Sequence, residues 1–198
     1  HMPWTLAHPA AVLPLRRLAD AGYLSFPALL VGCITPDVVY HVGRWDLGRL
    51  THTPVGMLLL DVPIGALLLW CCCALRVPVA NLLPQPHRSV LISVRFLEAR
   101  RGAASVRLFS LALGAATHLL WDSFTHATAF FVHAFEWLAW PVPFPGQEIR
   151  VYTLLQHGGS LVGVTALLIA YRRHCICTTG IDPWRSGTGG LGSLAAML

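Results

Sequence analysis

Residues 106–126, VRLFSLALGAATHLLWDSFTH, decide the fold expected for this chain. The stretch is an apolar run from Val106 that ends in His118 and Asp122, four residues apart. In an α-helix this spacing places both side chains on one face, as two ligands of one metal ion require. The run predicts a membrane-spanning helix, and an ionisable pair at the end of such a helix marks a functional site by default.

The composition extends this prediction to the whole chain. Of 198 residues, 55% are hydrophobic and only 12% are charged, and the mean hydropathy is +0.61, which is typical of an integral membrane protein. Spanning a bilayer needs roughly 20 apolar residues. We therefore predict an all-α membrane helical bundle with about four transmembrane helices, at Gly22–His41, Pro54–Leu75, Val106–Asp122 and Thr153–Tyr171.

The arginines give the bundle a direction. All 14 basic residues are arginine, and the four expected spans place 11 of them on one side and three on the other. The positive-inside rule then predicts a multi-pass protein of the bacterial cytoplasmic membrane with both termini in the cytoplasm. We attribute the net charge of +5 to loops that contact anionic lipids. Nothing in the sequence resembles a nucleic-acid-binding module. The three outer arginines are Arg44, Arg49 and Arg150.

The segments between and after the spans complete the expected organisation. Residues 2–173 form one helical membrane domain that begins with a short N-terminal segment, and residues 174–198, rich in Gly and Ser, form a flexible tail. Arg88–Arg101 alternates apolar and basic residues, which predicts either an amphipathic helix on the membrane surface or a helix that docks a soluble partner. Phe131–Trp140 and the following Pro-rich turn are a candidate cover for a site.

Ionisable residues gather at one expected membrane level. This topology brings His and Asp side chains from four helices to the outer face, which predicts a metal site. Mixed His and carboxylate ligands without Cys favour zinc, with manganese or iron as alternatives. The consecutive cysteines 71–73 lie inside an apolar helix and are interpreted as small hydrophobic residues. The expected ligands at this level are Asp37, His52, His118, Asp122 and His157.

Four further residues are candidates with less direct placement. His8 belongs to the ligand set only if the N-terminal segment enters the membrane or the first span is misplaced, because the topology puts it on the inner side. Asp61 lies within the second span, where a carboxylate must be paired or protonated, and we assign it a role behind the metal ligands or in helix packing. His126 and Glu148 are the candidate acid and base, and Asp61 is counted with them as catalytic.

In combination these motifs resemble a known family. They are Pro36-Asp37, Thr51-His52-Thr53 with Gly56, His118-Leu-Leu-Trp-Asp122, Gln156-His157-Gly158 and the opening Met2-Pro-Trp-Thr-Leu-Ala-His8-Pro. The chain resembles, from Met2 to about Tyr171, a bacterial membrane family of undefined function, common in actinobacteria and similar to the LexA-regulated membrane-bound metal-dependent hydrolases.

Two further implications come from resemblance alone. The order of the motifs is distantly similar to that of the zinc-dependent phospholipase C and nuclease group, which implies a primary site of Asp37, His52, His118 and Asp122. Asp122 would then bridge to a second metal near His8. Similar membrane proteins occur in valanimycin-type azoxy biosynthesis, which implies conversion of an aminoacyl hydroxylamine ester into an N–N-bonded product.

Two classes of function follow. The first is a membrane-embedded metalloenzyme that acts on an ester-like bond of a small or lipid-like substrate, either by hydrolysis or by an intramolecular rearrangement without water. The second is a non-enzymatic transporter subunit or scaffold whose His and Asp residues bind a structural metal or carry protons. Against the second, the sequence shows neither discontinuous helices nor an inverted repeat. The sequence does not indicate the oligomeric state.

Overall fold

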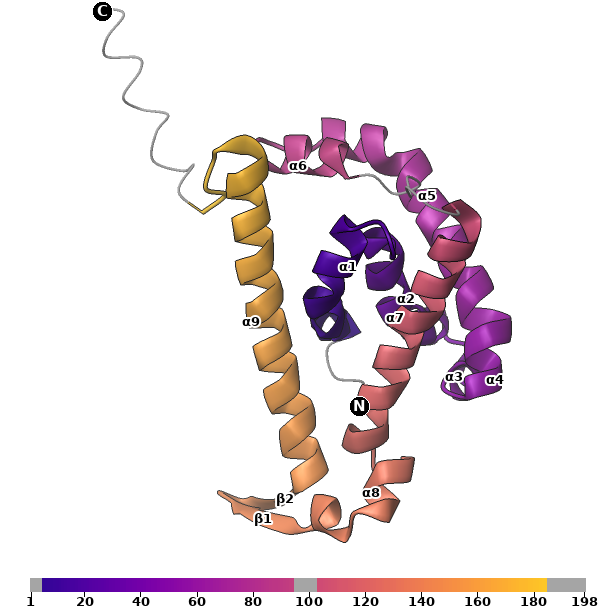
Figure 1. Ribbon diagram of the computed structural model, residues 1–198. Helices are drawn as coiled ribbons and strands as arrows, with labels where there is room; N and C mark the ends of the chain where they lie inside the picture. The colour runs from indigo at the N-terminus through magenta and orange to yellow at the C-terminus, as the bar shows by residue number, and fades with distance from the viewer. Residues whose placement is uncertain (1–4, 95–102, 185–198) are drawn as a thin grey trace, which may run out of the picture.

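The computed structural model describes residues 5–94 and 103–184 and shows an all-α membrane helical bundle with one short hairpin (Figure 1). In chain order the elements are η1 (Thr5–Leu15), α1 (Arg16–Asp20), α2 (Phe26–His41), α3 (Trp45–Thr51), α4 (Pro54–Gly56), η2 (Met57–Asp61), α5 (Val62–Asn81), α6 (His87–Ser93), α7 (Ala103–Thr125), α8 (Phe130–Ala134), η3 (Glu136–Ala139), β1 (Pro141–Phe144), β2 (Gln147–Arg150) and α9 (Val151–Thr179).

Three stretches of helix are long and apolar enough to cross a membrane, at Pro54–Asn81, Ala104–Ala134 and Val151–Thr179. They correspond to the second, third and fourth spans expected from the sequence. The first expected span is shorter than predicted, because Gly22 makes a turn with a positive φ of 84° and the helix starts only at Phe26. Helix α2 has 16 residues, about 24 Å at 1.5 Å per residue, which is less than the hydrocarbon core.

Helix α2 is the centre of the bundle. It packs most extensively on α7 and also contacts η1, α3 and α5. Two glycines allow the close approach of α2 and α7, since a Cβ on Gly32 would lie 2.2 Å from the Leu111 carbonyl oxygen and one on Gly114 would lie 2.3 Å from that of Leu29. Small residues at helix contacts are how membrane helices pack tightly. This contact holds the end of α2, with Asp37, against α7.

The N-terminal segment η1 lies inside the bundle and not beside it. It is a 3-10 helix that contains Pro9 and Pro14, and it packs on α9, α2 and α7. Gly163 of α9 provides the space, because a Cβ there would lie 2.9 Å from the Ala7 carbonyl oxygen. The sequence topology places this segment away from the ligands unless it enters the bundle. It does enter, and it brings the His8 ring to 3.8 Å from that of His118.

The connecting segments differ in part from the expectations. The predicted surface helix at Arg88–Arg101 begins as α6, His87–Ser93, and its residues from 95 onward lie outside the described residues. The boundary expected at residue 173 falls inside α9, which continues to Thr179, and residues 185–198 of the expected tail are likewise not described. The Pro-rich turn is an antiparallel hairpin in which Pro141 pairs with Arg150, and it lies at the end of the molecule opposite α6 (Figure 1).

Candidate metal centre

His118 is a buried imidazole with one nitrogen already fixed. It lies on α7 with 1% of its surface exposed, and its Nδ1 lies 2.7 Å from the backbone oxygen of Cys33 on α2. A carbonyl can only accept, so Nδ1 carries the proton and Nε2 holds a free lone pair. Nε2 is buried and has no hydrogen-bond partner. This is how a metal-ligating histidine is oriented, by a hydrogen bond from its other nitrogen.

His52 is prepared in the same way. It caps the C-terminus of α3, and its Nδ1 lies 2.8 Å from the Gly48 oxygen one turn earlier. The proton is therefore on Nδ1, and Nε2 faces the carboxylates. The neighbouring Thr51 is fully buried and donates its hydroxyl to the oxygens of Pro36 and Gly48, both at 2.9 Å. This hydroxyl ties α3 to α2 next to Asp37.

Asp37 has one oxygen occupied and one available. Its Oδ2 accepts a hydrogen bond of 2.6 Å from the hydroxyl of Thr5, which η1 supplies. The other oxygen, Oδ1, lies 3.4 Å from His52 Nε2 and 3.6 Å from His118 Nε2. One side chain of the N-terminal segment thus sets the orientation of a carboxylate on α2.

Asp122 completes a set of four facing atoms. Its Oδ2 lies 3.2 Å from His118 Nε2 and 3.5 Å from His52 Nε2. Four of the six distances among these atoms are thus 3.2–3.6 Å. A regular tetrahedron with metal–ligand distances of about 2.0–2.1 Å has edges of about 3.3–3.4 Å. These four contacts therefore have the length of the edges of such a tetrahedron.

Hydrogen bonding describes these distances less well. An N–H···O bond is normally 2.7–3.2 Å long, and three of the four contacts are longer than that. Each Nε2 also faces two carboxylates, although an imidazole nitrogen has one proton at most. A cation between the four atoms satisfies all of them, including the buried His118 Nε2 that has no hydrogen-bond partner.

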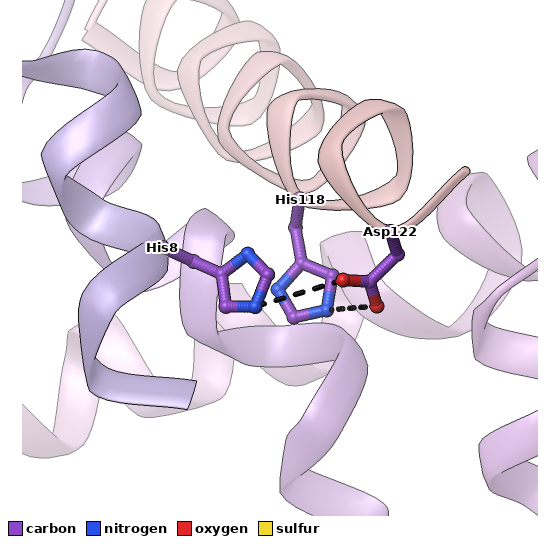
Figure 2. Close-up of side chains that lie close together, drawn as sticks. All are labelled: His8, His118 and Asp122. Carbon is purple, nitrogen blue, oxygen red and sulfur yellow. Dashed lines mark ion pairs between the residues drawn. The ribbon is translucent and has the colours of Figure 1, made fainter. Parts of the chain in front are cut away.

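The second oxygen of Asp122 faces a different pair of histidines. Its Oδ1 lies 3.7 Å from His8 Nε2 and 3.6 Å from His126 Nδ1. The His8 ring stacks on that of His118 with centroids 3.8 Å apart, and Figure 2 shows both imidazoles beside the Asp122 carboxylate. Among the described residues, two groups of three have ligand atoms within 4.8 Å of one another: His8, His118 and Asp122, and Asp37, His52 and His118.

The pKa values of His8 and His52, which lie outside the membrane-spanning helices, show how the surrounding charges and burial act at this site. Burial and the nearby His118 lower the pKa of His8 to about 4, so its imidazole is neutral and able to donate a lone pair. For His52, burial also acts to lower the pKa, but the carboxylates of Asp122 and Asp37 outweigh it and raise the value to about 10. Two buried carboxylates therefore attract positive charge to this point, as a metal ion requires.

Three predicted site residues lie elsewhere. His157 is exposed, because it is the adjacent Gln156 that turns inward on α9, with its Nε2 3.5 Å from His126 Nε2. The structure therefore does not bring His157 into the cluster, contrary to the prediction. Glu148 is exposed on β2 and has no contact with the cluster among the described interactions, so the structure does not support it as an acid or base at the site. Asp61 is buried at the end of η2 but is in neither ligand group.

Other residues of the site were not identified from the sequence. Thr5 and Thr51 orient Asp37 and the α3 turn, and Gln156 reaches the edge of the cluster. The signal for Gln156 in the sequence is its place in the Gln156-His157-Gly158 motif. Whether Gln156 or His157 faces the cluster depends on how α9 is rotated against the other helices.

Comparisons with known proteins identify a family whose function is unknown. No curated protein matches the chain, and no solved structure matches it. One family profile, described as a domain of unknown function (DUF4184), matches residues 2–184, which include every residue of the cluster. The chain therefore belongs to the DUF4184 family.

Proposed function

We propose that this protein is a membrane-embedded, zinc-type metalloenzyme that acts on an ester-like bond of a small or amphiphilic substrate. The observation that supports this most is the set of four contacts of 3.2–3.6 Å that join the Nε2 atoms of His52 and His118 to the carboxylates of Asp37 and Asp122. The resemblance to metal-dependent membrane hydrolases points to the same chemistry. The bacterial cytoplasmic membrane is the compartment that the arginine distribution favours.

The ligand types favour catalysis over a structural role. Structural zinc sites are rich in Cys, whereas catalytic sites use His and carboxylate ligands. The site also reaches the surface, since the side chains of His52 and His126 are 22% and 38% exposed. A zinc ion at such a position supplies a Lewis acid for a carbonyl and lowers the pKa of a coordinated water.

The chain's own residues supply the remaining functions. His126 lies between solvent and the Asp122 carboxylate, and it is the group placed to exchange a proton with the substrate. Gln156 fixes the His126 ring from α9. His8, neutral and stacked on His118, closes the inner side of the site and serves as a further ligand or as a base. The hairpin and α8 lie at the same end of the bundle and are the proposed cover.

Metal content tests the proposal directly. We expect purified wild-type protein to contain about one tightly bound zinc ion per chain by elemental analysis. Asp122→Asn, which keeps the shape of the side chain, and His118→Ala should both lose most of it. His157→Ala is the matched control, because this exposed histidine is outside the cluster, and it should retain the metal. A wild-type protein without metal, or equal metal in all four proteins, contradicts the proposal.

Two reactions use the same ligands. In hydrolysis, water adds to the ester carbonyl, the C–O bond to the leaving group breaks, and the oxygen of that water remains in the product acid. In the rearrangement of an aminoacyl hydroxylamine ester, the substrate amine bonds to the hydroxylamine nitrogen and the N–O bond breaks. The carboxylate released from that nitrogen stays in the product, because it belongs to the same amino acid as the amine. The second reaction consumes no water. Turnover in ¹⁸O-labelled water therefore distinguishes the two, because only hydrolysis incorporates the label during the reaction.

One observation favours the non-enzymatic alternative. Asp61 lies in a membrane-spanning helix, is 1% exposed, and neither of its carboxylate oxygens has a hydrogen-bond partner among the described residues. Such carboxylates occur in proton relays of transporters. If the protein is a transporter subunit or scaffold, metal-free His118→Ala will leave any substrate conversion unchanged, whereas the proposed enzyme will lose it.

A further inference from the structure

Aromatic rings border the partly exposed side of the metal centre. The two histidines of the site that reach the surface are His52 and His126. The Tyr40 ring lies 5.4 Å from that of His52 and 5.2 Å from that of Trp45, measured between centroids. Trp45 is 63% exposed, so three adjacent rings connect a metal ligand to the surface. Gly48 makes room for them, because a Cβ there would overlap the Tyr40 ring.

A second group of rings lies beyond His126. Phe124, two residues before His126 on α7, stacks on Phe131 of α8 with centroids 4.3 Å apart. Phe131 in turn stacks on Phe135, with centroids 5.7 Å apart. Residues 130–150, here called the aromatic segment, continue this pattern through η3 and β1. Its exposed aromatic side chains are Phe130, Phe135, Trp137, Trp140 and Phe144.

The aromatic segment connects two helices that are long and apolar enough to span a membrane. The stretch Ala104–Ala134 contains α7 and α8, and Val151–Thr179 begins directly after the hairpin (Figure 1). The elements α8, η3, β1 and β2 have four or five residues each and are too short to cross a bilayer. Trp side chains, which are apolar with one N–H donor, favour the level of the lipid headgroups. Composition and position therefore both match the membrane interface.

The α3 side of the site lies at the same level, since the centroids of the His52 and His118 rings are 5.4 Å apart. Exposed side chains on and beside α3 are apolar at Val42, Leu50 and Val55. An exposed apolar surface of this kind marks contact with a membrane or a partner. The charged residues of residues 44–50 and of the aromatic segment are three arginines and three acids, namely Arg44, Asp46, Arg49, Glu136, Glu148 and Arg150.

We propose that the metal centre takes its substrate from the bilayer interface, so that the substrate is an amphiphile whose ester-like bond lies among the headgroups while its chain stays in the hydrocarbon. The rings of α3 and of the aromatic segment hold the open side of the site at that level. This narrows the substrate class of the proposed function, on which it rests. A small water-soluble substrate would instead need an entrance lined by polar side chains.

Tryptophan fluorescence measures the depth of the rings. Protein is reconstituted into phosphatidylcholine vesicles with bromine, a quencher, placed near the headgroup or near the chain end. The difference between wild type and Trp45→Phe, or Trp140→Phe, isolates one indole. Both indoles should be quenched more strongly by the shallow bromine. Trp70, exposed on the spanning helix α5, is the matched reference and should be quenched more strongly by the deep bromine. If neither bromine quenches Trp45 and Trp140, these rings lie in water and the proposal is overturned.

Chain length tests the route to the metal. Hydroxamates chelate zinc through two oxygens, and hexanohydroxamate differs from acetohydroxamate by four methylene groups. At equal free concentration in water, zinc-loaded wild type in the same vesicles should bind hexanohydroxamate about a hundredfold more tightly, because the chain stays in the hydrocarbon while the hydroxamate binds. Asp122→Asn, which should lose the zinc, measures the probe that merely dissolves in the bilayer.

The two measurements separate the possible failures. Equal binding of both hydroxamates by zinc-loaded wild type would mean that the probe reaches the zinc from water, which overturns the interfacial route and leaves the metal function standing. If wild type holds no zinc and binds neither hydroxamate, the metal function fails and the substrate class fails with it. The quenching does not depend on zinc, so it reports the depth of the rings in either case.

Discussion

At the scale of single residues, three ligands of the cluster are each oriented by a hydrogen bond to another part of the protein. His118 and His52 use backbone oxygens of Cys33 and Gly48, and Asp37 uses the hydroxyl of Thr5. These bonds fix which atom of each side chain faces the centre. The hydrogen bond from Thr5 is the easiest of the three to test, because its hydroxyl can be removed with almost no change of side-chain volume.

Thr5→Val should weaken zinc binding by roughly tenfold, the lower end of the effect of losing a residue that orients a metal ligand. The variant should still fold, since only one hydrogen bond of about 1 kcal/mol is lost. Competition with a zinc-selective chelator measures the affinity. Thr165→Val is the control, because its hydroxyl bonds only to Leu161 within α9. Equal affinities of Thr5→Val and Thr165→Val would show that Thr5 does not orient Asp37.

At the scale of elements, two close contacts bring the ligands together. Helices α2 and α7 approach through Gly32 and Gly114, and η1 approaches α9 through Gly163. In each case a backbone carbonyl oxygen lies within 3 Å of the position that a Cβ would take. Backbone cannot rotate away as a side chain can, so the helices themselves must separate when a methyl group is added. The geometry of the site is therefore sensitive to residues that never touch it.

Gly32→Ala and Gly114→Ala should each lower the free energy of unfolding by about 2 kcal/mol or more, as overpacked cores do, and should reduce bound zinc. Gly158→Ala is the control on α9. Nothing lies within 4 Å of a Cβ there, so the change should be neutral or stabilise the helix by up to about 1 kcal/mol. Thermal unfolding in detergent and elemental analysis report both effects. Destabilisation by all three changes alike would refute a specific contact.

At the scale of the whole molecule, the two ends of the bundle differ in charge and in content. The end with α6 and the C-terminal turns of α9 carries Arg88, Arg172 and Arg173, while α8 and the β1–β2 hairpin lie at the opposite end (Figure 1). The metal ligands on α7 are close to the hairpin end, because His118 and Asp122 are in the last two turns of that helix. The positive-inside rule predicts that the hairpin end lies outside the cytoplasm.

Cysteine labelling in intact cells checks this orientation. Gln147→Cys, on the exposed hairpin strand β2, should react with a membrane-impermeant maleimide added outside. Wild-type protein, whose exposed Cys177 lies at the arginine-rich end, should not react until the cells are lysed. Labelling of wild type before lysis, together with protection of Gln147→Cys, would mean that the protein is inserted the other way round.

The sequence by itself determined the membrane bundle, three of its spans and most of the cluster. Apolar length and the i, i+4 spacing of His118 and Asp122 depend only on local order along the chain, so the sequence predicts Asp37, His52, His118 and Asp122 as ligands. These properties do not depend on how the helices pack. They were therefore readable from composition and spacing alone.

Only the tertiary structure decided the rest. Whether His8 reaches the site depends on η1 entering the bundle beside Gly163, and whether Gln156 or His157 faces inward depends on the rotation of α9. The first contact joins η1 to a part of α9 about 150 residues later, and the second joins α7 to α9 across about 30 residues. No local sequence pattern encodes packing between segments so far apart. The shortness of α2 has a similar origin, because the turn at Gly22 and the residues after it take up the start of the apolar run before the helix begins at Phe26.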